Sequence, residues 1–192
     1  MTKRFPSWRI TIRGLVGLIL TLALATQTAF AKNPSSEHIV ARFHHSLMHV
    51  MREAKSLGYE GRFKLLRPHI EKNFHIPIML RIAMGNFWQR ATKSQKERLI
   101  NAFTDISVGT YAARFSGYSG QTFLTKGSRK GPQNTILVDT ILRDPSGSDI
   151  PLTYITREIQ GTWHIIDILL STGISELAIP GALVEIRVTA RL

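Results

Sequence analysis

The spacing of hydrophobic residues changes near residue 120. From about residue 35 to residue 115, apolar positions recur every three or four residues, which is the period of an amphipathic helix. After the turn-rich FSGYSGQ segment they alternate with polar positions, which is the period of a β-strand. The pattern therefore predicts helices first and strands afterwards.

The first predicted helix begins after Asn33-Pro34 and ends near Leu57, just before Gly58. A shorter helical segment is predicted around residues 62–66, and Pro68 is expected to begin another turn that leads to Asn73-Phe74. The apolar face of the first helix comprises Ile39, Val40, Phe43, Leu47, Val50, Met51, Ala54 and Leu57.

Pro77 is suited to open the next helix, which is predicted over residues 76–91. Apolar side chains surround most of this helix, so we expect it to be buried or to face a cavity as well as the core. Thr92 and Gln95 form a T-x-x-Q capping box that opens a helix ending near Phe115. The predicted inner face of that helix comprises Leu99, Ile100, Phe103, Ile106, Tyr111 and Phe115.

Four strands are predicted at residues 121–127, 134–144, 150–159 and 162–171, separated by the turn segments GSRKGP, DPSGSD and QGT. This spacing is typical of an antiparallel meander. The predicted fold class is α+β, with N-terminal helices packed on a four-stranded sheet. Residues 32–192 have a length that suits a single domain.

Residues 1–31 read as a secretory signal peptide. Four basic residues precede the apolar run from Gly14 to Ala25, and Ala29-Phe30-Ala31 matches a cleavage signal. The apolar run is shorter than a membrane span requires, although an uncleaved anchor is the alternative reading. We therefore expect an exported protein that begins near Lys32.

The composition excludes some kinds of catalytic and metal site and favours some kinds of binding partner. The chain has no Cys, so thiolate metal sites and cysteine nucleophiles are excluded. Its net charge is +12, of which four charges lie in the predicted signal peptide, so the rest carries +8. A basic surface of this kind favours anionic membranes or acidic proteins, and export argues against nucleic acid.

Local catalytic and metal motifs are weak. His164 and Asp167 lie three apart in a predicted strand, so their side chains are expected on opposite faces of the sheet. Asp167 is then either a structural carboxylate with a hydrogen-bonding or cationic partner, or a general base in a pocket. His38, His45 and His49 share a helix face, but zinc sites usually draw ligands from more than one element. We interpret these histidines as solvent-facing and predict no metal site.

An ordered set of sequence blocks resembles the MlaC family of periplasmic lipid-carrier proteins. The blocks extend over roughly residues 37–177, and the SGYSGQTF and STGISEL segments look closer to the hopanoid-associated HpnM branch. The matching positions are Gly85, Trp88, Ala91-Thr92, Gln95, Thr110-Tyr111, Trp163, Asp167 and Gly173-Ile174-Ser175.

The resemblance implies a non-enzymatic carrier without a cofactor, which holds lipid chains in an apolar pocket. The implied cargo is phospholipid or a hopanoid-type lipid. The implied partners are an inner-membrane ABC-type lipid transporter and an outer-membrane lipoprotein/porin complex, with transient membrane-surface contact by a monomer. The implied location is the periplasm, and the implied roles are outer-membrane lipid asymmetry and toluene tolerance.

Candidate pocket residues come from the apolar positions of the central helices and the strands. They are Phe74, Ile78, Met79, Ile82, Met84, Phe87, Trp88, Phe103, Ile106, Tyr111, Phe115, Val138, Ile166 and Ile168. Structural roles are expected for Thr92, Gln95, Trp163 and Asp167. Arg81, Arg90 and Arg114 are candidates to meet a lipid phosphate or an acidic partner.

Two departures from the family pattern stand out. Asn73-Phe74 replaces the common Asp-Phe, which removes a charge, and the chain from about residue 178, AIPGALVEIRVTARL, lacks the usual polar-apolar helix. Two other function classes stay open. One is a small periplasmic enzyme with a cone-shaped pocket that uses Asp167 or Asp139 as base, and the other is an adaptor without bound lipid.

Overall fold

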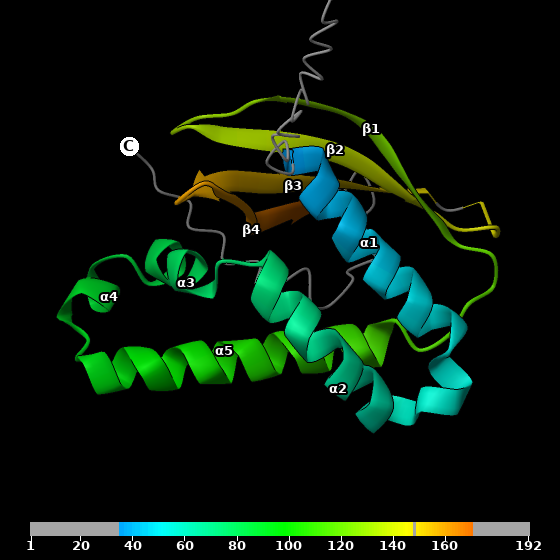
Figure 1. The fold of residues 1–192 in the computed structure, drawn as a ribbon, viewed down its shortest axis with the longest axis horizontal. Helices are drawn as coiled ribbons and strands as arrows, with labels where there is room; N and C mark the ends of the chain where they lie inside the picture. Colours follow the sequence, from blue (N-terminus) through cyan, green and yellow to red (C-terminus); the bar gives the residue numbers. More distant parts are fainter. Residues whose placement is uncertain (1–34, 148, 171–192) are drawn as a thin grey trace, which may run out of the picture. The chain divides into compact units, whose positions relative to one another are not determined.

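The computed structural model describes residues 35–147 and 149–170, which form five helices and a four-stranded sheet. The predicted signal peptide, the Gly173-Ile174-Ser175 block and the atypical C-terminus lie outside the described residues. Within the described part, no helix has both the length and the apolar character needed to cross a membrane. Figure 1 shows the strands gathered in one layer, with the helices on one side of it. The predicted α+β class is confirmed.

Helix α1 comprises Ser36–Arg52, and the hydroxyl of Ser35 caps it by accepting from the backbone N–H of His38. Helix α2 comprises Ala54–Asn73 and contains a kink at Gly58, whose φ of 58° is a conformation that glycine adopts at little cost. The first helix thus ends at Arg52 instead of near Leu57, and the helical segment predicted around residues 62–66 is part of a longer helix after the kink at Gly58. The predicted turn at Pro68 was wrong, since Pro68 lies inside α2 between the buried Leu66 and Ile70, whose packing offsets the local cost of proline.

The predicted helix over 76–91 is divided in two. Helix α3 comprises Ile76–Met84 and helix α4 comprises Asn86–Arg90, with Gly85 between them at φ 51° and ψ −123°. The expectation of burial was wrong for part of this segment, because the side chains of Ile82 and Phe87 are exposed. The break at Gly85 redirects the chain, so the two short helices present different faces to the core.

Helix α5 comprises Lys93–Arg114 and begins at the predicted capping box, in which Thr92 and Gln95 each accept from the other's backbone N–H. Its buried face differs from the prediction, because Ile106 is exposed while Thr104 and Ser107 are buried. Their hydroxyls donate to the backbone oxygens of Ile100 and Phe103, at 2.8 Å and 2.6 Å. This satisfies polar groups that a hydrophobicity pattern assigns to the surface.

The sheet is the predicted meander, in the order β1-β2-β3-β4 with antiparallel neighbours. The strands comprise Thr122–Lys130, Thr135–Arg143, Asp149–Ile159 and Thr162–Leu170. The chain between α2 and α3 adds to the edge of β4, where Phe74 forms a parallel bridge with Ile165 and the His75 backbone N–H donates to the Ile165 oxygen at 2.9 Å. Strand β4 is therefore covered at that edge.

A β-bulge in β4 corrects the predicted orientation of His164 and Asp167. Asp167 pairs with Ile155 and His164 pairs with Arg157, so Ile166 is the extra residue between them. Because Ile155 and Arg157 are two positions apart on β3, their partners lie on the same face of the sheet. The expectation of opposite faces was wrong, although no hydrogen bond between described side chains joins this pair.

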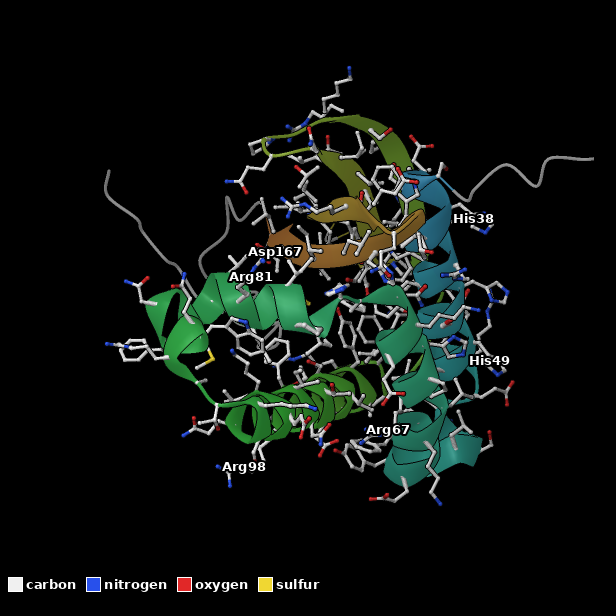
Figure 2. The ribbon with its side chains drawn as sticks, turned by 60° about the vertical axis from the view of Figure 1, so that its left-hand side comes forward. His38, His49, Arg67, Arg81, Arg98 and Asp167 are labelled. Carbon is white, nitrogen blue, oxygen red and sulfur yellow. The ribbon has the colours of Figure 1, made fainter. Side chains whose placement is uncertain are left out.

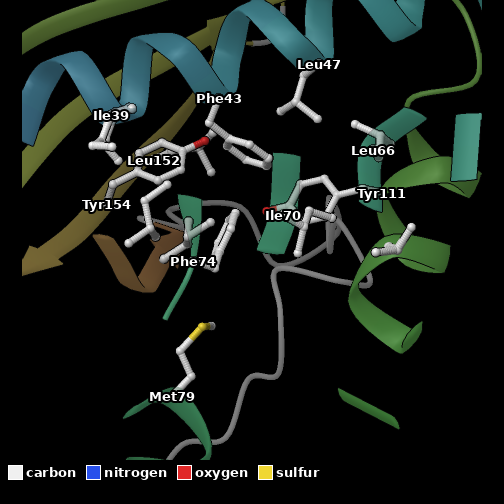
Figure 3. Close-up of a cluster of buried hydrophobic side chains, with 14 of the residues drawn as sticks. Ile39, Phe43, Leu47, Leu66, Ile70, Phe74, Met79, Tyr111, Leu152 and Tyr154 are labelled. Atoms are coloured by element: carbon white, nitrogen blue, oxygen red, sulfur yellow. The ribbon is translucent and has the colours of Figure 1, made fainter. Parts of the chain in front are cut away.

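The core lies between the sheet and the helices. Helix α1 contacts all four strands, and the ring of Phe43 packs edge-to-face against Phe74 and Tyr111, with centroid distances of 4.9 Å and 5.2 Å. Figure 3 shows these rings with the aliphatic side chains of α1 and α2 around them. The aromatic cluster joins α1, α5 and the segment between α2 and α3, and so holds α3 to α5 against the rest of the core.

Candidate functional site

A cleft of about 560 Å³ lies where α3, α4 and α5 meet. The turn at Gly85 and the capping box at Thr92 set its shape, because they fix where α4 and α5 begin. Apolar and cationic side chains both contribute to its wall. The lining residues are Met84, Phe87, Arg90, Ala91, Gln95, Arg98, Leu99 and Ala102.

Large apolar side chains stand exposed on these three helices. Ile82 is 52%, Phe87 67% and Ile106 62% exposed. Ile106 lies four residues after Ala102 on α5, so it continues the helix face that lines the cleft. We call Phe87 and Ile106, together with the cleft, the apolar surface of α3 to α5. Exposed apolar surface of this kind is typical of a site that binds a lipid, a ligand or a partner.

Cationic groups lie over the two aromatic rings of α4. The guanidinium carbon of Arg90 lies 4.9 Å from the centroid of the Phe87 ring, and Lys96 Nζ lies 5.6 Å from that of Trp88. Arg98 adds a second guanidinium to the cleft. Three arginines were predicted to meet a lipid phosphate or an acidic partner. Arg90 lines the cleft, whereas Arg81 and Arg114 do not. Figure 2 shows Arg81 on α3 and Arg98 on α5.

The fourteen predicted pocket residues occupy three environments. Six are buried in the core, namely Phe74, Met79, Tyr111, Val138, Ile166 and Ile168. Five are partly buried, namely Ile78, Met84, Trp88, Phe103 and Phe115, and Ile82, Phe87 and Ile106 are exposed. Met84 and Phe87 line the cleft. A role in lipid binding stays a prediction for each of them.

The residues expected to be structural lie as follows. Thr92 and Gln95 form the capping box, and Trp163 is half-buried against the core. The carboxylate of Asp167 accepts from the backbone N–H of Ile168 at 2.8 Å, and burial raises the pKa of Asp167. Its partner is therefore the adjacent backbone.

The other candidate base, Asp139, is tied into the sheet. It accepts from the hydroxyl of Thr153 at 2.7 Å and from Arg129 Nε at 3.1 Å. Neither Asp139 nor Asp167 lines the cleft. Both carboxylates therefore make contacts within the sheet.

The predicted histidines of α1 are exposed at positions 38, 45 and 49. Figure 2 shows His38 and His49 on the outer side of this helix. Among residues 35–147 and 149–170, no three metal-binding side chains come together.

Sequence reasoning missed Arg98, Leu99 and Ala102 as cleft residues. The available signal was spacing, because Gln95, Leu99 and Ala102 recur at intervals of four and three on one face of α5. Arg98 lies three residues after Gln95, beside that face. Which helix covers the opposite wall could not be read from spacing, since that depends on the break at Gly85.

The family model described as MlaC protein matches residues 42–179. The chain belongs to the MlaC family. A solved phospholipid-binding protein from Ralstonia solanacearum, in complex with a phospholipid, has a TM-score of 0.63 at 20% sequence identity. The match covers 71% of this chain and 78% of that chain, and it shows a shared fold. A search of curated protein sequences finds no match to this chain.

Proposed function

We propose that this protein is a periplasmic lipid carrier. It binds phospholipid or a hopanoid-type lipid and passes it between an inner-membrane ABC-type transporter and an outer-membrane lipoprotein/porin complex. The proposal rests on one observation above the rest, which is the apolar surface of α3 to α5 in a chain of the MlaC family.

The physical chemistry of this surface suits lipid. Burying an acyl chain releases roughly 0.8 kcal/mol per CH₂ group, so an apolar surface with no reactive group is sufficient for binding. The exposed side chains of Phe87 and Ile106 would lose their contact with water when a lipid covers them. The cleft volume of about 560 Å³ falls within the range of roughly 300–1,000 Å³ that is usual for ligand sites.

The cations at the cleft suit a phosphate headgroup. A guanidinium offers paired N–H donors to phosphate oxygens, and Arg90 and Arg98 lie among the apolar lining residues. A phospholipid would then place its acyl chains on the apolar side chains and its phosphate beside the two arginines. A hopanoid-type lipid without phosphate would use the apolar contacts alone.

The proposal is tested by native mass spectrometry of the protein exported and purified without detergent, followed by organic extraction and lipid analysis. Lipid that copurifies at near one-to-one stoichiometry supports the carrier and identifies its cargo. A protein that is empty and also fails to take up added phospholipid or hopanoid contradicts it. That result would favour the adaptor reading, in which the apolar surface binds a protein.

A further inference from the structure

A second cleft, of about 510 Å³, lies between α1 and α2, away from the apolar surface of α3 to α5. We call it the basic cleft, because five of its lining residues are cationic or can become so. Among the described residues that line it, none is a carboxylate. The lining residues are His38, Ala41, Arg42, His45, Ser46, Pro68, His69 and Lys72.

The acidic residues beside this cleft are engaged elsewhere. Glu37, which precedes His38, accepts a hydrogen bond from Ser128 on β1. Glu71, which precedes Lys72, forms an ion pair with Arg67 at 3.4 Å. Among the described residues, neither of these carboxylates forms an ion pair with a cation of the cleft.

The guanidinium of Arg42 is held by a neutral group. Its Nε and Nη2 donate to Asn73 Oδ1 at 3.0 Å and 2.9 Å, and the buried Asn73 in turn donates to the backbone oxygen of His69 at 2.6 Å. An amide oxygen fixes the position of the guanidinium but leaves its full charge uncompensated. The cleft thus contains a pre-positioned cation, which reduces the ordering cost of binding an anion.

Ser46 orients the imidazole of His69. Its hydroxyl donates its one hydrogen to the backbone oxygen of Arg42 at 3.1 Å, so Ser46 Oγ accepts from the Nδ1–H of His69 at 2.9 Å. With Nδ1 already protonated, Nε2 is the atom that gains a proton when His69 becomes cationic. A proton added there supplies a further donor and a further positive charge.

We propose that the basic cleft binds a phosphate group, with Arg42 and Lys72 as permanent cations and His69 as a cation that depends on pH. Phosphate is the ligand of choice because its oxygens accept several charge-assisted hydrogen bonds at once. The group has two sources, a free phosphate or the headgroup of an anionic lipid at a membrane surface. The proposal does not rest on the lipid site of α3 to α5, since the two clefts share no residue.

Binding of a phosphodiester headgroup, whose charge is the same at pH 6 and pH 8, should strengthen in this cleft as the pH falls. Burial lowers the pKa of His69, and the charges of Arg42, His49, Lys72 and His45 lower it further. A bound phosphate opposes those charges and so raises the pKa of His69. Linkage then requires that protonation of His69 tightens phosphate binding in return.

The test follows the histidine resonances of the full protein by NMR while inorganic phosphate is added, at pH 6 and at pH 8. A second arm measures cosedimentation with phosphatidylcholine vesicles that either contain or lack phosphatidylglycerol. Lys72→Gln removes an exposed cation of the cleft, and Lys64→Gln makes the same charge change at an exposed position of α2 outside the cleft.

We expect saturable shifts of the His45 and His69 resonances at pH 6, with affinity weakened by about tenfold in Lys72→Gln and unchanged in Lys64→Gln. Saturation by inorganic phosphate identifies free phosphate as a ligand. Binding only to vesicles with phosphatidylglycerol, again weakened in Lys72→Gln, identifies the headgroup. Equal weakening in both variants, or no saturable response in either arm, would overturn the proposal.

Discussion

The Nε2 atom of His44 lies 2.9 Å from the hydroxyl oxygen of Tyr154, in the contact between α1 and the sheet. The imidazole also stacks on Phe123, with 3.9 Å between ring centroids, and the side chain is almost fully buried. A charged imidazolium would lose most of its hydration there. Burial accordingly lowers the pKa of His44 to about 3.

This buried histidine predicts that the protein loses stability in mild acid. The unfolded chain binds a proton at His44 near pH 6.5 while the folded chain does not, so stability is present above pH 6.5 and is lost as the pH falls toward 3. We expect a loss of about 2 kcal/mol between pH 7 and pH 5 from this group. Urea unfolding across that range measures it.

Two variants distinguish the contribution of His44 to the pH dependence of stability from that of the other histidines. His44→Phe keeps an aromatic ring in the core and should remove that part of the pH dependence, whereas His49→Phe, at an exposed position of the same helix, should leave it in place. The half-buried His69, His75 and His164 contribute with the same sign, because burial lowers their pKa values as well. If stability depends on pH in His44→Phe as it does in the wild type, the buried imidazole is not the source of that dependence.

The contribution of Asp167 to stability depends on pH with the opposite sign. Burial raises the pKa of its carboxyl, so the folded state favours the protonated acid and stability falls as the pH rises above about 3.8. Asp167→Asn keeps the oxygen that accepts from Ile168 and removes the charge. We expect a melting temperature at pH 7 that is unchanged or higher than that of the wild type, and a marked decrease would contradict this.

Arg62 connects α5 to α2 on both sides of the kink at Gly58, and should be critical for stability. Its Nε donates to the backbone oxygen of Ala112 at 2.8 Å and its Nη1 to that of Ala54 at 2.9 Å, with 8% of the residue exposed. Arg62→Met should cost about 2–4 kcal/mol, because both oxygens lose a charged donor in a buried place. Arg67→Met, which removes an exposed ion pair with Glu71 and Asp105, should cost less than about 1 kcal/mol. Chemical denaturation measures the free energy of unfolding of both variants. Equal losses of stability would show that the hydrogen bonds of Arg62 are not critical.

The elements that could be predicted from the sequence carry local signals. The capping box at Thr92 and Gln95 and the four turn-separated strands each depend on residues within a few positions of one another. The kink at Gly58 and the break at Gly85 are also marked by glycine, although the sequence does not say whether a glycine ends a helix or only bends it. Tertiary packing decides between the two.

The remaining differences arise from contacts between distant parts of the chain. The bulge in β4 depends on its pairing with β3, so simple alternation assigned His164 and Asp167 to opposite faces. Ser107 is buried because its hydroxyl bonds to the helix backbone, while the apolar Ile106 beside it is exposed. Each cleft needs two or more helices that the spacing alone does not bring together.

The apolar surface predicts that lipid retention can be reduced without loss of the fold. Phe87→Gln combined with Ile106→Gln replaces two exposed apolar side chains, so stability should change by less than about 1 kcal/mol. Lipid that copurifies with the protein should decrease severalfold, as measured by native mass spectrometry. Leu124→Gln, a similarly polar change at an exposed position of β1, is the control and should retain lipid. Equal retention in all three proteins would place the lipid elsewhere.

The two arginines of the cleft predict selectivity for lipids with phosphate. Arg90→Gln combined with Arg98→Gln removes both guanidinium groups and leaves the apolar lining in place. We expect phospholipid binding to weaken by about tenfold or more, because charge-assisted hydrogen bonds to phosphate are lost, while binding of a lipid without phosphate is unchanged. Competition with a fluorescent fatty acyl probe measures both affinities in the same protein. Arg81→Gln, at an exposed position of α3 outside the cleft, should behave as wild type. If Arg81→Gln weakens phospholipid as much as the double variant does, the effect comes from net charge, and Arg90 and Arg98 do not form a headgroup site.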